Sequence, residues 1–311
     1  MSALQTAVIV NPHSANRRTG KRWPAASGQL RAAIGGFDTF FTDRPGHASV
    51  LARRLAEEGC ARIIAAGGDG TVNEIVNGLL DERGQVLNPD VTLGVLPLGT
   101  GGDFRRSLGL AGLSDGIQAI AAGKVRQIDA GCVLFRAHDG KPGRRYFANL
   151  VSFGMGGEVA LRAKNALGVF GGKAAFLYAT VSVFFSYRPK TVRLRFDSLQ
   201  AARSFPILNV AVGNGRFHGG GMHVCPRAAL HDGLFDVTVI DALGMLTLLK
   251  DLHVLYSDNI YQHPKTHHFR VQRVTAESDQ RTGIEVDGEP LGTLPVEIFV
   301  LPGRLRLFSK V

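Results

Sequence analysis

Gly67-Gly68-Asp69-Gly70-Thr71-Val72-Asn73-Glu74 is the stretch that decides the fold of the first part of this chain. It follows the apolar run Arg62 to Ala66, which predicts a short buried strand, and it leads into apolar residues at helical spacing. Glycines between a strand and a helix let the backbone approach phosphate oxygens closely, and the first N–H groups of the helix point at the anion. The stretch therefore predicts a phosphate site, although a tight turn with a helix-capping Asp would share part of the pattern.

A second glycine loop, Leu98 to Phe104, offers further backbone donors together with Thr100 and Asp103. Asp69 in the first loop would be repelled by bare phosphate, so a divalent cation is expected between them. The chain has neither the P-loop pattern nor a dinucleotide fingerprint after its first strand. Two glycine loops with an aspartate in each favour a nucleoside triphosphate with magnesium.

The first part of the chain alternates short apolar runs with helical patterns. This alternation predicts a parallel sheet covered by helices on both faces, with ligands at the carboxyl ends of the strands. Asn11, Thr42 and the two glycine loops all follow predicted strands. The predicted strands are 7–10, 37–42, 62–66 and 91–96, and the predicted helices are 21–33, 47–58 and 72–80.

The rest of the chain has closely spaced strand patterns separated by turn residues. We expect a mostly antiparallel, sandwich-like β domain, interrupted by helices at 155–187 and 244–257. The predicted strands are 126–135, 146–153, 192–196, 206–212, 234–240, 269–275 and 294–301.

The net charge of +10 is unevenly distributed. Residues 1–130 have 14 Lys and Arg against 12 Asp and Glu, whereas the rest of the chain has 22 against 14. A basic second half suits an anionic partner such as a membrane surface, a nucleic acid or an acidic substrate, and a merely solvated face is the alternative. No nucleic-acid module is recognisable, so no nucleic-acid partner is expected.

Targeting and redox features indicate a cytoplasmic protein. The chain has three cysteines, far apart and without a C-x-x-C pair, which predicts free thiols in a reducing compartment. No secretion signal is apparent at the N-terminus. The nearly uncharged stretch from Ala174 to Tyr187 is shorter than the ~20 residues that span a bilayer. We expect a soluble protein that can touch a membrane surface peripherally.

Two turns in the second half have candidate acidic residues. Glu285 to Pro290 groups three carboxylates, and one of them is a candidate general base, although Asp287-Gly288 alone is also a common hairpin signal. The turn at Asp232-Gly233 could hold a metal through one carboxylate and nearby carbonyls. A zinc site is a weaker alternative there, because the spacing of the nearby histidines and Cys225 matches no standard zinc pattern.

Taken together, these motifs resemble the diacylglycerol kinase catalytic-domain family, which includes bacterial diacylglycerol kinases, sphingosine kinases and related soluble lipid kinases. The resemblance covers nearly the whole chain. It implies an N-terminal phosphofructokinase-like three-layer α/β nucleotide domain (1–128) and a C-terminal β-sandwich for the lipid substrate (129–295), with residues 296–311 returning to the first domain. The shared motifs are Val10-Asn11-Pro12, Gly67–Glu74 with Asn77-Gly78, Pro97–Gly101 with Asp103-Phe104, Gly213-Asn214-Gly215, Asp232-Gly233 and Asp287-Gly288-Glu289.

The resemblance also implies roles for individual residues. Glu289 would be the general base, Asp287 would assist the metal–water network, and Asp69 would organise the catalytic Mg²⁺. Asp232, with the carbonyls of Ala229 and Leu234, would hold a structural Mg²⁺. The residues expected to contact ATP are Asn11, Thr42, Gly67, Gly68, Asp69, Gly70, Thr71, Val72, Asn73, Gly99, Thr100 and Gly101.

The chain departs from the family pattern at two places. Gly102 stands where the family usually has Asn, and His13 to Asn16 replaces the small glycine turn that usually follows Asn-Pro. The expected activity is transfer of the γ-phosphoryl group of ATP to a hydroxyl of a diacylglycerol-like or sphingoid lipid. An NAD kinase-like enzyme with a soluble substrate, or a non-catalytic nucleotide- or lipid-binding regulator, are the alternatives.

Overall fold

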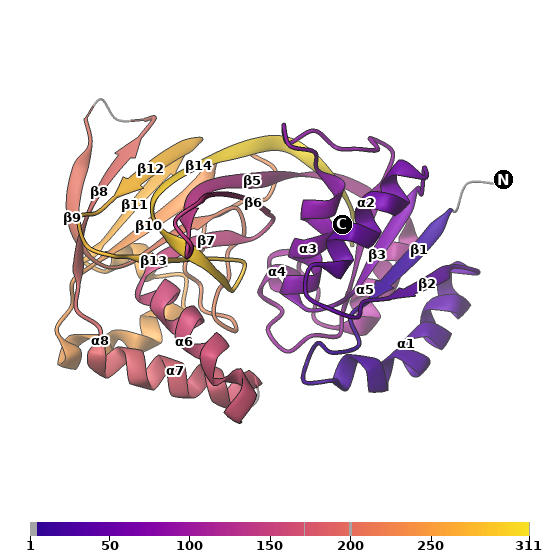
Figure 1. Ribbon diagram of the computed structural model, residues 1–311, viewed down its shortest axis with the longest axis horizontal. Helices are drawn as coiled ribbons and strands as arrows, with labels where there is room; N and C mark the ends of the chain where they lie inside the picture. Colours follow the sequence, from indigo (N-terminus) through magenta and orange to yellow (C-terminus); the bar gives the residue numbers. More distant parts are fainter. Residues whose placement is uncertain (1–4, 171, 199–200, 311) are drawn as a thin grey trace. The chain divides into compact units, whose positions relative to one another are not determined.

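The computed structural model describes residues 5–170, 172–198 and 201–310. The chain divides into two compact units: Met1–Ala130 with Leu301–Val311 form unit 1, and Gly131–Val300 form unit 2. Two long strands, β5 (Val125–Ala137) and β14 (Glu289–Phe308), run from one unit into the other (Figure 1).

Unit 1 alternates strands and helices, as the sequence predicts. Its strands pair in the order β2–β1–β3–β4, all parallel, and the end of β14 adds a further parallel strand through the pairing of Leu307 with Leu93. The elements are β1 (Thr6–Val10), α1 (Arg18–Ile34), β2 (Asp38–Phe41), α2 (His47–Glu57), β3 (Arg62–Gly67), α3 (Asp69–Leu79), β4 (Thr92–Pro97), α4 (Asp103–Ser107) and α5 (Leu113–Ala122).

The inner strands of unit 1, β1, β3 and β4, are almost wholly buried because helices cover both faces of the sheet. On one face, Trp23 of α1 and Ile120 of α5 pack with Ile64 of β3 and with Phe308 from the end of β14. Helices α2 and α3 contact each other as well as strands β1 and β3. The parallel strands all end at the same edge of the sheet, from which the two glycine loops leave.

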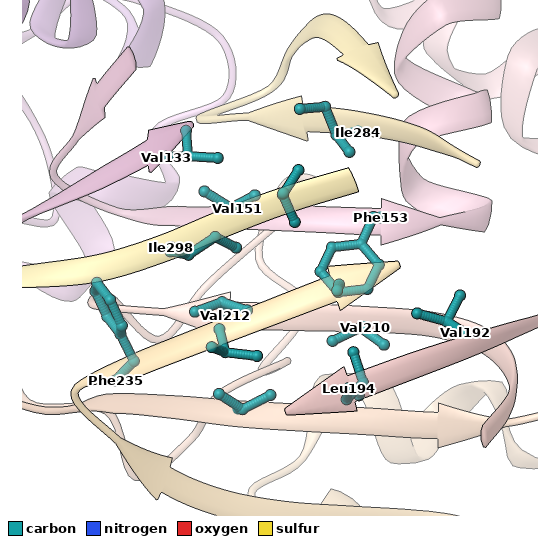
Figure 2. Packing of buried hydrophobic residues seen from close by; sticks show 14 of the residues in the cluster. Val133, Val151, Phe153, Val192, Leu194, Val210, Val212, Phe235, Ile284 and Ile298 are labelled. Atoms are coloured by element: carbon teal, nitrogen blue, oxygen red, sulfur yellow. The ribbon is translucent and has the colours of Figure 1, made fainter. Parts of the chain in front are cut away.

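Unit 2 is β-rich. The antiparallel pairings run from β7 to β9, β8, β12, β14, β13 and back to β7, so these six strands close around one apolar core (Figure 2). Strands β10 and β11 extend the sheet from β9, and β6 pairs with β5. This architecture confirms the expected β-rich second half.

The remaining elements all belong to unit 2. They are β6 (Pro142–Phe147), β7 (Leu150–Gly154), α6 (Met155–Phe170), α7 (Gly172–Ser186), β8 (Lys190–Phe196), β9 (Arg203–Gly213), β10 (Phe235–Asp241), α8 (Met245–Asp251), the 3₁₀ turns η1 (Leu252–Tyr256) and η2 (Ile260–Gln262), β11 (Thr266–Val271), β12 (Arg273–Glu277) and β13 (Gly283–Val286).

Two predicted strands are each divided by a carboxylate from elsewhere in the chain. The run 146–153 forms β6 and β7, and the corner between them donates backbone N–H groups to Asp287. The run 269–275 forms β11 and β12, and the N–H groups at its break go to Asp197. A buried backbone N–H group needs a hydrogen-bond acceptor. When a carboxylate from a distant segment accepts these N–H groups, the strand ends there, although the local sequence pattern predicts that it continues.

Several helical predictions also differ in detail. The predicted helix 155–187 is two helices, α6 and α7, and 244–257 is α8 followed by η1. Helix α5 was not predicted. Its Gly116 weakens the helical pattern, but an added Cβ there would lie 2.5 Å from the carbonyl oxygen of Val95. The glycine thus allows α5 to lie close to β4.

The three cysteines are free, as expected, and all three are buried. Among residues 5–170, 172–198 and 201–310, no helix is long and apolar enough to cross a membrane. The nearly uncharged stretch from Ala174 falls in α7.

Truncation of Phe308 tests whether the end of β14 is an integral part of unit 1. Phe308→Ala removes a side chain that is 5% exposed in the unit 1 core, and we expect unfolding free energy to fall by about 3 kcal/mol. The measurement is urea unfolding followed by the fluorescence of Trp23, the single tryptophan, which lies in the same core. Val50→Ala, at a position 58% exposed, is the control. An unchanged midpoint for Phe308→Ala would contradict the assignment.

Candidate functional site

The two glycine loops of unit 1 are joined directly by their backbones. The carbonyl oxygen of Gly67 accepts hydrogen bonds from the N–H groups of Leu98 (3.1 Å) and Gly99 (2.8 Å). An added Cβ on Gly99 would lie 2.3 Å from the Cα of Gly68, and one on Gly67 would lie 2.4 Å from Oγ1 of Thr71. Glycine is therefore required at position 99 for the two loops to pack on each other, and at position 67 to leave room for the side chain of Thr71.

Asp69 bridges the two loops with its carboxylate. It accepts hydrogen bonds from the backbone N–H groups of Asp103 (3.0 Å) and Phe104 (3.2 Å). Burial raises the pKa of the Asp69 carboxyl, and repulsion from the Asp103 carboxylate raises it further, although the N–H of Asp103 acts in the opposite direction. A cation bound beside Asp69 would stabilise its ionised form, which burial and the charge of Asp103 disfavour.

Arg106 also holds the second glycine loop in place. Its Nη1 donates to the carbonyl oxygen of Gly101 (2.8 Å) and to Oδ1 of Asp103 (3.0 Å). Gly102 has a φ of +71°, a left-handed conformation that glycine and asparagine adopt more readily than other residues. The glycine thus keeps the backbone geometry that the usual Asn would also allow, and what the chain lacks here is the amide side chain.

Asn11 links the first strand to the glycine loop. Its backbone N–H donates to the carbonyl of Ala66 (3.1 Å), and its Nδ2 donates to Oγ1 of Thr71 (3.2 Å). Thr42 is buried, and its N–H donates to the carbonyl of Val10 at the end of β1. Thr100 is exposed at the tip of the second loop. The structure therefore brings Asn11, Thr71 and the two loops together at one edge of the sheet.

Part of the first motif serves the fold. Val72 and Asn73 are buried, so only their backbones can face a ligand. Glu74 accepts hydrogen bonds from the N–H groups of Gly46 (2.8 Å) and Ala48 (3.0 Å), and thereby caps the start of α2. The motif combines a candidate ligand site with the contact that places α2 against α3.

A basic cluster at the start of α1 was not predicted. Residues 15–17 all have positive φ without a glycine, an unusual conformation that concentrates at functional sites. Arg17, Arg18, Lys21 and Arg22 are exposed around the N-terminus of α1, where the helix dipole disfavours cations. Positive charge at the positive end of a helix suits an anion, and the run of basic residues after Asn16 was the available signal.

In unit 2, Asp287 and Gly288 form the two-residue turn of the β13–β14 hairpin. Both have positive φ, +47° and +87°, as a type I′ turn requires. The carboxylate of Asp287 accepts the N–H groups of Ala148 (3.3 Å), Asn149 (3.2 Å) and Leu150 (2.9 Å). These hydrogen bonds show that Asp287 anchors the turn to the corner between β6 and β7. Its role in a metal–water network stays a prediction.

Asn149 joins the same corner to the Gly213-Asn214-Gly215 motif. Its carbonyl accepts the N–H groups of Asn214 (2.9 Å) and Gly215 (2.7 Å), and its Nδ2 donates to the carbonyl of Phe217 (2.9 Å). Three segments that are distant in sequence are thus tied together around the candidate catalytic turn. An isolated asparagine gives no sequence signal for this function.

Two further carboxylates, Glu289 and Glu285, flank the turn. Oε2 of Glu289 accepts a hydrogen bond from Nη2 of Arg145 on β6 (2.9 Å), and both side chains are partly exposed. Glu285 is fully buried, and it accepts the N–H of Gly288 (2.7 Å) and lies 3.4 Å from Nε2 of His218. The cation of Arg145 holds Glu289 in place, and Glu285 supports the turn from within the unit.

The expected metal position at Asp232 already has a cation beside it. One carboxylate oxygen of Asp232 accepts the N–H of Leu234 (3.1 Å), and the other is hydrogen-bonded by the guanidinium of Arg270. Nε of Arg270 also lies 3.8 Å from Oδ2 of the buried Asp236. No group of three or more His, Cys, Asp or Glu side chains suited to a metal occurs in the part of the chain that the structure describes. The role of Ala229, Asp232 and Leu234 as ligands stays a prediction.

Comparison with known proteins gives a consistent result. Residues 5–133 match the diacylglycerol kinase catalytic domain, and residues 149–309 match the YegS C-terminal NAD kinase beta sandwich-like domain. A "Probable lipid kinase YegS-like" of Chromohalobacter salexigens is 32% identical over 83% of this chain and 78% of its own length. A "Diacylglycerol kinase" of Staphylococcus saprophyticus is 26% identical over 97% of this chain and 94% of its own length.

The fold is also similar to a crystal structure of a diacylglycerol kinase from Bacillus anthracis. The superposition covers 100% of this chain and 98% of that chain, with a TM-score of 0.72 and 21% sequence identity.

Gly99→Ala tests the contact between the glycine loops. The added Cβ would meet the Cα of Gly68, so the loops must separate, and we expect the unfolding free energy of unit 1 to fall by about 1–3 kcal/mol. Urea unfolding followed by Trp23 fluorescence measures this loss. Gly36→Ala, where an added Cβ meets nothing within 4 Å, is the control. Equal midpoints for the two variants would show that the loops do not need this close approach.

Arg270→Gln tests whether Arg270 supplies the positive charge at Asp232. We expect Mg²⁺ to change the melting temperature of wild type no more than that of Asp232→Asn, because the guanidinium already neutralises the carboxylate. In the variant the melting temperature should fall by roughly 5 °C, and Mg²⁺ should restore part of the loss. Asp232→Asn is the control for Mg²⁺ binding elsewhere. A wild-type melting temperature that rises with Mg²⁺, and does not rise in Asp232→Asn, would contradict this expectation.

Proposed function

This chain belongs to the diacylglycerol kinase catalytic-domain family and is a lipid kinase, and from that premise we propose the reaction that it catalyses. We infer that it transfers the γ-phosphoryl group of ATP to a hydroxyl of a diacylglycerol-like or sphingoid lipid in a Mg²⁺-dependent reaction. The proposal rests on one observation above all: two glycine loops bonded backbone to backbone, with Asp69 and Asp103 held together at their junction.

The loops of unit 1 form the nucleotide subsite in this proposal. The backbone at the start of α3 and the loop backbone at Thr100 and Gly101 suit phosphate oxygens, because the neighbouring glycines leave room for close approach. The N–H of Gly99 is already bonded to Gly67 and holds the two loops together. Asn11 holds the hydroxyl of Thr71 in place beside the first loop. The exposed cations at the start of α1 add positive potential for a polyphosphate.

The residues at Asp69 fit a divalent cation. Burial and the neighbouring Asp103 disfavour the ionised form of Asp69 in the free protein, so a cation there would be bound favourably. Bound Mg²⁺ would neutralise the charge that develops on the transferred phosphoryl group. Asp69 would hold it, and Arg106 would keep Asp103 and the second loop in position.

Glu289 is the general base of the proposed reaction. It would accept the proton of the lipid hydroxyl while the hydroxyl oxygen forms a bond to the γ-phosphorus and ADP leaves. Its carboxylate is oriented by Arg145, and the turn that places it is fixed by the bonds of Asp287 and Glu285. A base held by a rigid turn keeps the orientation that proton transfer needs.

The charge of the chain suits a site of action at a membrane surface. The basic second half would bring a cytoplasmic enzyme to the anionic inner surface of a membrane, where the lipid substrate is found. The enzyme would remain peripheral there.

Asp69→Asn should separate activity from stability. We expect turnover to fall by ~10² or more, because the variant loses the charge that organises the metal. The unfolding midpoint at neutral pH should change little, because two effects oppose each other. A pKa raised in the folded state means that ionised Asp69 destabilises the fold above that pKa, and the amide removes this penalty. The amide nitrogen, however, cannot accept the backbone N–H that one carboxylate oxygen of Asp69 accepts. Asp90→Asn, at an exposed side chain, is the control. A near-normal rate for Asp69→Asn would exclude the role.

Glu289→Gln should abolish transfer and leave ATP binding intact. The amide can still accept the hydrogen bond of Arg145 but cannot take a proton, so we expect turnover to fall by about 10²–10⁴. ATP consumption with Mg²⁺ is measured against a panel of lipids in mixed micelles, with NAD and water alongside. Glu277→Gln, which also loses a carboxylate paired with an arginine, is the control.

The outcome of that panel distinguishes the candidate activities. Transfer to one lipid class, lost in Glu289→Gln, supports the proposal and identifies the substrate. Transfer to NAD alone would identify a kinase of a soluble substrate, and ATP binding without any transfer would identify a regulator. A collapse of ATP affinity in Glu289→Gln would make Glu289 a binding residue and not the base.

A further inference from the structure

Helix α7 is rich in apolar residues. From Ala174 to Ser186 it contains no charged residue. One side packs against α6, where Ala179 and Val183 form a small core with Val159. The hydroxyls of Ser182 and Ser186 accept hydrogen bonds from Arg162 of α6. A helix with this many apolar residues is normally enclosed, by protein or by lipid.

The other side of α7 is exposed. Tyr178 is 49%, Val181 is 48% and Phe185 is 69% exposed. Their spacing of three and four residues places them on one side of the helix, and we call these three residues the outer face of α7. Three large apolar side chains side by side form a patch of the kind that marks an interaction site, in contrast to single exposed residues.

A second helical segment of unit 2 shares this property. Leu246 in α8 is 84% exposed, and Leu252 and Tyr256 in η1 are 45% and 58% exposed. Six of the ten large hydrophobic side chains exposed in the described part of the chain are therefore on α7 or on α8–η1. Figure 1 shows α7 and α8 on the same side of the strands of unit 2.

The charges around α7 are almost all positive. Residues 155–190 contain five Lys and Arg, and Glu158 is their one acidic residue. Glu158 is paired with Lys190, so its charge is already balanced. Lys164 and Arg188 are exposed. This combination of apolar residues and cations is complementary to an anionic bilayer, which offers acyl chains below a layer of phosphates.

The length of α7 decides how it would meet a bilayer. Its 15 residues correspond to about 22 Å of helix, short of the ~30 Å hydrocarbon core. A short apolar helix fixed to a folded unit on one side would lie in the plane of the interface, with its exposed face in the acyl boundary.

We propose that the outer face of α7 is the surface by which this enzyme docks on an anionic lipid bilayer. Tyr178, Val181 and Phe185 enter the boundary between headgroups and acyl chains, and the cations of the α6–α7 hairpin contact the lipid phosphates. The proposal rests on the proposed lipid kinase function, because it assigns the membrane contact of that enzyme to one helix.

Co-sedimentation of the full-length protein with vesicles tests the proposal. The vesicles are phosphatidylcholine with or without phosphatidylglycerol. We expect wild type to bind the anionic vesicles and to bind less as salt increases. The double variant Val181→Ser with Phe185→Ser should lose binding tenfold or more. The double variant Lys164→Gln with Arg188→Gln should lose the preference for phosphatidylglycerol.

The control is a matched pair in unit 1. Val50→Ser with Phe41→Ser also replaces one valine and one phenylalanine, at positions 58% and 53% exposed, and it should bind vesicles as wild type does. Equal binding by the α7 double variant, or an equal loss in the control, would overturn the proposal. Circular dichroism melting of each variant identifies any that does not fold, and Phe185→Ser alone then replaces the double variant.

Activity in mixed micelles separates this proposal from the proposed function. In detergent micelles, which present the lipid without a bilayer, the α7 double variant should phosphorylate lipid at the wild-type rate. With vesicles its rate should fall with its binding. Binding to anionic vesicles through α7, without phosphorylation of any lipid in micelles, would overturn the proposed function and leave the docking surface in place.

Discussion

The close approach of two loop backbones is the constraint on which the candidate nucleotide site depends. Strands β3 and β4 pair up to Gly67 and Pro97, and the loops that follow continue the contact through the hydrogen bonds from Leu98 and Gly99 to Gly67. The backbones lie too close for a side chain at Gly99. This contact places Asp69 where it can accept the N–H groups of the second loop, and so brings the two acidic groups together.

The sequence predicts most strands and helices of unit 1, because the spacing of apolar residues marks them. Its two candidate ligand loops are marked by their glycines. The sequence predicts the β-rich character of unit 2 as well, but not where its strands end. The corner after Phe147 and the break at Gln272 depend on carboxylates contributed by Asp287 and Asp197, which are 137 and 75 residues away from the backbone that they bind. The pairing of Arg145 with Glu289 is equally distant in sequence, and no local pattern records such contacts.

The acidic residues of the motifs therefore differ in what they do in the free protein. Asp287 and Glu74 use their carboxylates to bind backbone N–H groups, and they hold a corner and a helix start in place. Glu289 faces an arginine, and Asp69 is held beside a second carboxylate. A sequence motif therefore contains two kinds of acidic residue: those that hold the backbone in place and those whose chemistry suits the reaction. Only the contacts in the structure show which residue is of which kind.

The division of the chain also has a consequence for synthesis. Unit 2 consists of one continuous segment, whereas unit 1 is completed only by residues 301–311. On the ribosome, unit 2 can fold as soon as it emerges, while β4 still lacks the neighbour that the end of β14 provides. Until residues 301–311 have emerged, the nascent first unit has an open sheet edge and a core without Phe308, and an open edge can pair with another chain.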